Sequence, residues 1–297
     1  MAISQVSLLG VPTSAGTHGP GLEKAPAHVR AAGLVQRLRD AGVTVDDLGD
    51  LPEVRFRPDP SSRTAQSLAA VVAVASEVAA RVEGIVRGGG SPFVVGGDCT
   101  VTLGVVAGFL RAGKDIGLFY FDGDIDLATP ERTVSGILDT MGMAHLLGEG
   151  APALGRLAQR HPLMSADRIL AFGYDLVEVD EAAAAAQRRL GLVGVPADDV
   201  VDPAGQAREA WDTLAARAAD GVLLHFDVDV IDSTDLPLAD FPHFNQGLSW
   251  PAVGECLRVF GAQETLSGLV LTEINPNRDP DGLLVRELLD VVVEAVS

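Results

Sequence analysis

Short hydrophobic runs alternate along the chain with longer stretches in which apolar residues recur every three or four positions. The short runs predict strands at residues 4–9, 43–48, 92–95, 116–121, 168–172, 191–195, 222–226 and 268–274. The longer stretches predict helices, for example at residues 24–40, 65–87, 101–112, 206–219 and 250–260, with another surface helix around residues 182–186. Eight hydrophobic strands separated by helices indicate an α/β fold: a mostly parallel eight-stranded sheet in a three-layer α/β/α architecture.

The chain shows no internal division. Apart from the loop near residues 58–62, no Pro/Gly/Ser-rich stretch interrupts it, so we expect a single domain over residues 1–297. The longest apolar runs, such as residues 68–75, are far shorter than the roughly 20 residues that span a bilayer, so no membrane contact is expected. The amino terminus lacks a basic segment, and two cysteines cannot form a disulfide framework. Both features predict a cytoplasmic protein.

The charge balance narrows the choice of partners. The sequence has 41 acidic and 22 basic residues, which gives a net charge of −19. Such a surface repels a phosphate backbone, so nucleic acid is a poor partner. A metal ion or a cationic small molecule suits this balance better.

Acidic residues follow the carboxyl ends of four predicted strands, where ligands gather in parallel sheets. These acids are Asp98, Asp122, Asp124, Asp126, Asp227, Asp229, Asp232 and Glu273. In an extended chain, Asp122, Asp124 and Asp126 would point to one side, and Asp227 and Asp229 would do the same. Because converging carboxylates repel one another and are costly to desolvate, a cluster of divalent metal ions is the simplest compensation. Solvated loop acids would explain two Asp-x-Asp runs poorly.

Two other metal-using motifs fit the spacing less well. Asp122, Asp124 and Asp126 match the start of an EF-hand loop, but Leu127 and Thr133 occupy the glycine and glutamate positions of that loop. The Asp-x-Asp runs also resemble haloacid-dehalogenase-type phosphatases, which use a downstream lysine. No lysine follows Lys114.

The order of the motifs resembles the ureohydrolase superfamily of arginase and agmatinase, nearly end to end. Residues 10–16 resemble the amino-terminal segment of that family, and residues 96–100 resemble its Gly-Gly-Asp-His-Ser motif. Residues 122–126 resemble Asp-Ala-His-x-Asp, residues 227–232 resemble Asp-x-Asp-x-x-Asp, and residues 273–279 resemble Glu-x-Asn-Pro-x-x-Asp. The resemblance implies an arginase-like fold.

The resemblance also implies a site with two divalent ions, most often Mn²⁺. The matching ligands are Cys99, Asp122, Asp126 and Asp227 for one ion, and Asp122, Asp124, Asp227 and Asp229 for the other. In this family a metal-bridging hydroxide attacks the guanidinium carbon, so the implied activity is hydrolysis of a guanidino or amidine C–N bond. Glu273 would hold the guanidinium, and Asp126, Glu273 and Asp139 are the expected catalytic residues. Relatives often form trimers or hexamers, although others do not, so a homo-oligomer is one expectation.

Two ligand positions depart from the family, because Cys99 and Asp124 replace histidines. Five aspartates and a thiolate give two divalent ions an excess of negative charge, which makes a bound water less acidic. A thiolate also shifts the preference toward softer metals such as Zn²⁺. Alternatively, Cys99 stays protonated, or it is a small core residue.

The loop after residue 126 departs as well. Asp139 replaces a proton-shuttling histidine, and Ala128 and Ile137 replace polar contacts, whereas Ser135 remains as a substrate contact. His243 is a candidate to rim the pocket, bind the substrate and supply a proton. True arginase activity is therefore not expected. The pattern resembles the branch that hydrolyses Nω-hydroxy-arginine, whose hydroxyguanidine is less basic than a guanidine. The alternative is a catalytically impaired paralogue that acts as a binding or scaffold protein.

Overall fold

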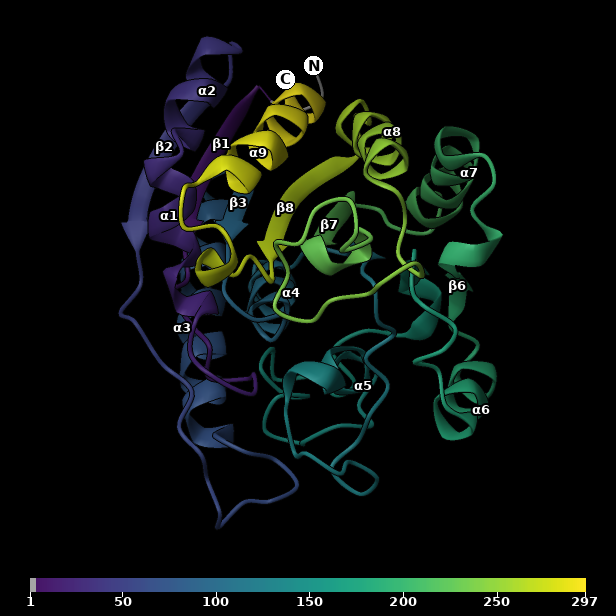
Figure 1. Ribbon diagram of the computed structural model, residues 1–297. Helices are drawn as coiled ribbons and strands as arrows, with labels where there is room; N and C mark the ends of the chain where they lie inside the picture. The colour runs from purple at the N-terminus through teal and green to yellow at the C-terminus, as the bar shows by residue number, and fades with distance from the viewer. Residues whose placement is uncertain (1–3) are drawn as a thin grey trace.

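The computed structural model describes residues 4–297, so the amino-terminal residues from which a cytoplasmic location was expected lie partly outside it. Within this range the eight expected strands are present and form one sheet, in the order β2-β1-β3-β8-β7-β4-β5-β6 (Figure 1). Their bounds are Gln5–Gly10 for β1, Thr44–Asp50 for β2, Pro92–Val95 for β3, Gly117–Phe121 for β4, Ile169–Phe172 for β5, Val193–Val195 for β6, Val222–Asp227 for β7 and Leu266–Thr272 for β8. Every neighbouring pair is parallel. The expected parallel α/β architecture is confirmed.

Helices cover both faces of the sheet. Successive strand residues point to opposite sides, and hydrophobic side chains on each side pack against helices. Phe93 and Val95 pack into one core and Val94 into the other. The first core is covered by α1 (Ala25–Ala31), α2 (Leu34–Asp40), α7 (Pro203–Ala215), α8 (Trp250–Gly261) and α9 (Leu283–Val296). The second is covered by α3 (Leu68–Arg87), α4 (Val101–Arg111), α5 (Gly142–Leu146) and α6 (Glu181–Leu190). The three layers are therefore helices, sheet and helices.

The single helix expected over residues 24–40 is wrong, because the chain forms two helices there. The break lies at Gly33, whose φ of +93° is a left-handed conformation that glycine adopts without steric cost. The N–H of Gly33 still bonds to the Arg30 carbonyl, which closes α1 before α2 begins at Leu34. The expected helix at 206–219 likewise begins earlier, at Pro203, because Asp202 caps it by accepting the N–H of Gly205.

Strand order brings the acidic strand ends together. Strands β3, β8, β7 and β4 are consecutive neighbours in the sheet, and these are the strands that precede Cys99, Glu273, Asp229 and Asp122. Their last residues are also nearly level across the sheet, since Phe121 pairs with Phe226 and the next residue of β7, Asp227, pairs with Thr272. Residues far apart in sequence therefore meet at one edge of the sheet.

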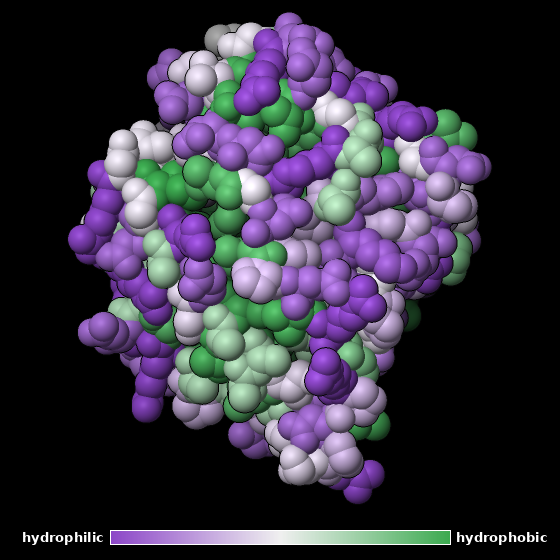
Figure 2. Space-filling model, turned by 90° about the vertical axis from the view of Figure 1, so that its left-hand side faces the viewer, coloured by the Kyte–Doolittle hydropathy of each residue, from purple (hydrophilic) through white to green (hydrophobic). Residues whose placement is uncertain are grey.

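One edge of the sheet is strand β2, whose Asp46, Asp47 and Asp50 make it acidic. Arg30 from α1 donates hydrogen bonds of 2.7 Å to both Asp47 and Asp50. Figure 2 shows this side of the molecule, where hydrophilic residues surround smaller hydrophobic areas. Charged side chains on an edge strand disfavour pairing with another sheet.

Of the helices within residues 4–297, none combines the length and the apolar character needed to cross a membrane.

Candidate metal centre

The acids after β4 reach the site through a turn. The N–H of Gly123 donates to the Asp229 carboxylate (2.9 Å), and the N–H of Asp124 donates to the Asp122 carboxylate (2.7 Å). Asp126 has a φ of 49°. The expectation that Asp122, Asp124 and Asp126 share one side of an extended chain is therefore wrong, since β4 ends at Phe121. The three side chains nevertheless line the same cavity.

The same correction applies after β7. The strand ends at Asp227, and Val228–Val230 form a turn of 3₁₀-helix. The N–H of Asp229 donates to the Asp227 carboxylate at 2.8 Å. Each strand end thus uses one carboxylate oxygen to fix its own backbone and leaves the other oxygen for the site.

Cys99 lies among the first group of acids. Its Sγ atom is 2.5 Å from Asp227 Oδ2, 3.7 Å from His225 Nε2 and 4.0 Å from Asp122 Oδ2. The candidate ligand atoms of these four buried residues all lie within 4.8 Å of one another. Burial raises the pKa of the Cys99 thiol, and the charge of Asp227 raises it further. Without a cation the thiol therefore keeps its proton and donates a hydrogen bond to Asp227.

His225 is a member of this group that the sequence reasoning left without a role. It is fully buried, with Nε2 3.0 Å from Asp122 Oδ2 and Nδ1 2.7 Å from Thr102 Oγ1. Its ring stacks on Tyr120 with centroids 4.2 Å apart. Burial lowers the pKa of His225 to about 3, so the ring is neutral at physiological pH. The ring and its partners hold the Asp122 carboxylate in place.

A second group consists of Asp124, Asp229 and His243, whose candidate ligand atoms also lie within 4.8 Å of one another. His243 Nε2 is 3.6 Å from Asp124 Oδ2. Burial opposes protonation of this ring, but the Asp124 and Asp229 carboxylates outweigh it and raise the pKa of His243 to about 10. Burial and the charge of Asp122 raise the pKa of Asp229 to about 8.

A third group joins Cys99, Asp139 and Glu273. The main-chain N–H of Cys99 donates to Asp139 Oδ1 at 2.7 Å. Glu273 Oε1 is buried and has no hydrogen-bond partner among residues 4–297. Burial raises the pKa of the Glu273 carboxyl, and the charge of Asp139 raises it further; desolvation does the same to the pKa of Asp139. Two carboxyl groups this close repel each other when both are charged, so a shared proton or a bound cation stabilises them.

Two residues of the site have left-handed backbones that glycine normally adopts. Asp126 has a φ of 49° and Glu273 a φ of 64°. Such conformations cost of order 1–3 kcal/mol each and concentrate at functional sites. The hydroxyl of Tyr120 donates to Asp126 Oδ2 at 2.6 Å, and the N–H of Glu273 donates to the Gly97 carbonyl at 2.9 Å. These bonds hold both carboxyls over the cavity.

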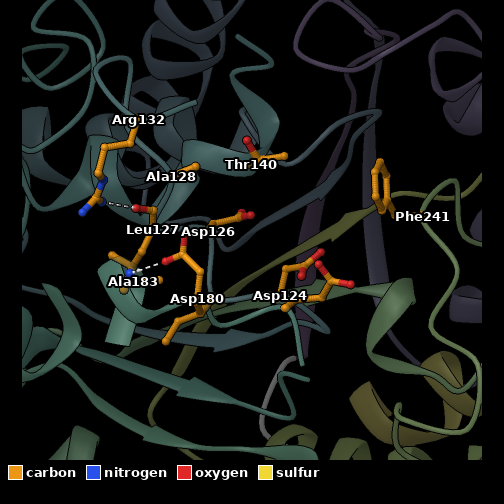
Figure 3. A pocket seen from close by; sticks show the side chains of 11 residues that line it. Asp124, Asp126, Leu127, Ala128, Arg132, Thr140, Asp180, Ala183 and Phe241 are labelled. Atoms are coloured by element: carbon orange, nitrogen blue, oxygen red, sulfur yellow. Dashed lines mark hydrogen bonds between the residues drawn. The ribbon is translucent and has the colours of Figure 1, made fainter. Parts of the chain in front are cut away.

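Two adjoining cavities lie at the site. The inner one, of about 30 Å³, is lined by Cys99, Asp139, Glu273 and the other clustered acids. The outer one, of about 180 Å³, is drawn in Figure 3 and extends from Asp124 and Phe241 to Arg132 and Asp180. Asp124, Asp126, Thr140 and Phe241 line both cavities.

Two expected substrate contacts lie away from these cavity walls. Ser135 accepts the N–H of Ile137 and lies 3.4 Å from the Thr133 hydroxyl. His243 is buried behind Asp124. Within the described part of the chain, neither residue is among those that line the two cavities.

The donor set fits divalent cations. Within residues 4–297 no lysine or arginine pairs with the clustered acids. The basic groups beside them are the neutral ring of His225, next to Asp122, and the ring of His243, next to Asp124. Buried carboxylates without cationic partners are costly, and Glu273 Oε1 lacks any partner in the described chain. Oxygen ligands suit Mn²⁺, and the added sulfur of Cys99 suits Zn²⁺.

Known proteins share both the sequence pattern and the fold. The model of the Arginase family matches residues 4–296. Arginase from Bacillus caldovelox is 28% identical over 279 residues, which cover 92% of this chain and 92% of that protein. Human Arginase-1 is 28% identical over 286 residues, covering 92% and 85%. The native structure of Bacillus caldovelox arginase matches with a TM-score of 0.90 at 24% identity and covers 99% of both chains. The chain therefore belongs to the arginase family.

Proposed function

We propose that this protein is a metal-dependent hydrolase that cleaves a C–N bond of a linear guanidino or amidine compound. Family membership supports this class of reaction, and the observation that carries it is the cluster of acids without lysine or arginine ion pairs within residues 4–297. Cys99, Asp122, Asp126 and Asp227 would hold one divalent ion. Asp122, Asp124, Asp227 and Asp229 would hold the other. When bound, such ions would lower the pKa of a water molecule and so would supply a hydroxide nucleophile at neutral pH.

Glu273 is the proposed acceptor for the substrate. Its Oε1 atom is buried and without a hydrogen-bond partner in the described structure, and its side chain lines the inner cavity. A guanidinium group offers several N–H donors and a positive charge, which a carboxylate accepts in charge-assisted hydrogen bonds. The reacting carbon would then lie beside the clustered aspartates.

Asp139 is the proposed proton carrier. It lines the inner cavity, contacts Glu273 within the third group and is fixed by the N–H of Cys99. From this place it would deliver a proton to the departing amine. Asp126, held by Tyr120, would orient the attacking water as well as bind metal.

The finer proposal concerns the substrate. A carboxyl group stands where the related enzymes carry a shuttle histidine, so a less basic hydroxyguanidine such as that of Nω-hydroxy-arginine suits the site better than arginine. The outer cavity offers Glu178 and Asp180 to an amino group and Arg132 to a carboxylate, which matches the far end of an amino acid (Figure 3). The role of Ser135 as a substrate contact stays a prediction.

A substrate panel tests the proposal. The Mn²⁺-loaded and Zn²⁺-loaded proteins are incubated with arginine, agmatine and Nω-hydroxy-arginine, and the release of urea or hydroxyurea is measured. We expect turnover of the hydroxyguanidine that exceeds turnover of arginine, and we expect Asp229→Ala to abolish it. A protein that binds metal but turns over none of these compounds would favour the binding or scaffold role, which the loss of two ligand histidines at Cys99 and Asp124 supports.

A further inference from the structure

The loop between β7 and α8 delivers a buried histidine to the second group of acids. The N–H of Ser233 donates to the carbonyl of His243 at 2.8 Å, and the N–H of Gln246 donates to the Asp232 carboxylate at 2.9 Å. These bonds fold the loop back over the end of β7. As a result His243 is only 5% exposed although it lies in a loop.

The ring of His243 presents a free nitrogen to the acids. Nε2 is buried, has no hydrogen-bond partner within residues 4–297, and lies 3.6 Å from Asp124 Oδ2. A nitrogen of the His243 ring and candidate ligand atoms of Asp124 and Asp229 all lie within 4.8 Å of one another. A buried, unpartnered nitrogen is costly unless something binds it.

The other ring nitrogen faces a carboxylate outside the cluster. His243 Nδ1 lies 3.5 Å from Asp175 Oδ2, which is itself buried and without a hydrogen-bond partner in the described chain. Asp175 is held to the site because its N–H donates to the Gly123 carbonyl at 2.8 Å. When a cation among the acids displaces the Nε2 proton, a carboxylate behind Nδ1 favours keeping the other proton on Nδ1, which leaves the Nε2 lone pair to bind the ion.

Gly123 makes room for this ring. A Cβ atom at Gly123 would lie 2.8 Å from Cδ2 and 2.9 Å from Nε2 of His243, which is closer than real side chains allow. The motif that this segment resembles has alanine and histidine at positions 123 and 124, whereas this chain has glycine and aspartate. Glycine at position 123 therefore leaves the space that the His243 ring, which comes from another loop, occupies.

We propose that His243 is a ligand of the second divalent ion, together with Asp124 and Asp229, and that Asp175 orients its ring. The inference rests on the proposed two-metal site and extends it with a ligand from outside the aspartate motifs. A neutral imidazole adds affinity for Mn²⁺ or Zn²⁺ without adding to the excess negative charge of the acids. It replaces the nitrogen ligand that position 124 lacks. It also differs from a role in substrate binding, because His243 is not among the residues that line the two cavities in the described structure.

Metal titration of the full chain, stripped of metal, tests this assignment. Free Mn²⁺ is measured by electron paramagnetic resonance, and bound metal is counted per chain. We expect two bound ions in the wild type and a rise in the dissociation constant of the second ion of at least about tenfold in His243→Ala, with the first ion little changed. Asp175→Asn should weaken the second ion by about 10–100-fold, which is the usual cost of losing an outer carboxylate partner. Imidazole should restore binding in His243→Ala, and His161→Ala, which removes an exposed histidine, is the control.

The outcomes separate this inference from the proposed function. If the wild type binds two ions and His243→Ala binds both with unchanged affinity, His243 is not a ligand and the two-metal site stands. If the wild type binds no Mn²⁺ or Zn²⁺, the proposed function fails and this inference fails with it. Circular dichroism in EDTA checks the fold of each variant. If His243→Ala does not fold, His243→Gln and Asp175→Asn decide the question, and normal binding of the second ion in both would overturn the assignment.

Discussion

The main-chain N–H of Cys99 donates a hydrogen bond of 2.7 Å to the carboxylate of Asp139. This bond joins a candidate metal ligand at the end of β3 to the proposed proton carrier in the loop after β4. Asp139 is thereby fixed at the inner cavity, next to Glu273.

Asp139→Asn should separate proton transfer from metal binding. Asparagine keeps an oxygen that accepts the Cys99 N–H but loses the ionisable proton. We expect the turnover number to fall by about 10²–10⁴-fold, the usual contribution of a general acid, while the metal content stays that of the wild type. Steady-state kinetics and metal analysis of the same preparation measure both. Unchanged turnover would mean that Asp139 carries no proton in the reaction.

Tyr120→Phe should weaken the first metal ion. The substitution removes the hydroxyl that donates to Asp126 at 2.6 Å and keeps the ring that stacks on His225. Because partners of ligands usually contribute about 10–100-fold to metal affinity, we expect a loss in that range. Tyr174→Phe is the matched control, since its hydroxyl bonds to Gln187 at 3.1 Å. Equal metal affinities in the two variants would exclude the proposed support of Asp126.

The stability of the metal-free protein should fall as the pH rises from about 6.5 to 8. Burial raises the pKa of both Asp122 and Asp229 to about 8, far above the value near 3.9 of an unfolded aspartate. Over this range the folded state binds more protons than the unfolded state, so the free energy of unfolding decreases with pH. His145 and His225 act in the opposite direction, because burial lowers the pKa of each, but their effect fades above pH 6.5 as the unfolded histidines lose their protons.

Thermal unfolding in EDTA measures this dependence. We expect the melting temperature to fall between pH 6.5 and 8 without metal, and to fall less or rise with saturating Mn²⁺, since ions replace the protons. The double variant Asp122→Asn, Asp229→Asn should flatten the metal-free profile. A metal-free melting temperature that rises over this range would contradict the desolvated acid cluster.

Cys99 should bind metal as a thiolate. Burial raises the pKa of its thiol, but a cation among Asp122, Asp227 and Cys99 favours loss of the proton. The Co²⁺-loaded protein should therefore show a sulfur-to-metal charge-transfer band in the near ultraviolet. The band should disappear in Cys99→Ser and persist in Cys256→Ser, which removes the other buried cysteine, in α8. If the band persists in Cys99→Ser as well as in Cys256→Ser, Cys99 stays protonated or lies off the metal.

Much of the fold follows from the sequence because the central strands are buried on both faces and appear as continuous hydrophobic runs. Among the strands, predicted and observed bounds agree for Pro92–Val95 and differ by at most two residues at each end for the others. One helix was predicted over residues 24–40, whereas the chain forms two. The break at Gly33 depends on its left-handed φ, which the spacing of hydrophobic residues does not reveal.

The site was harder to derive, because local backbone geometry and distant loops complete it. The aspartate runs could be located from the sequence, but the two-residue period of a strand gave the wrong orientation past Phe121 and Asp227, where turns begin. The place of His243 depends on a loop that folds back through bonds to Ser233 and Asp232, and no spacing rule connects it to Asp124. The sequence reasoning singled out this histidine without finding its neighbours.

The central claim is that the clustered acids at the strand ends hold divalent cations, and metal content measures this most directly. The protein is purified, incubated with excess Mn²⁺ or Zn²⁺ and desalted, and the bound metal is counted by mass spectrometry. The account predicts about two ions per chain in the wild type, with at least one lost in Asp229→Ala. A protein that remains metal-free after both incubations would contradict it.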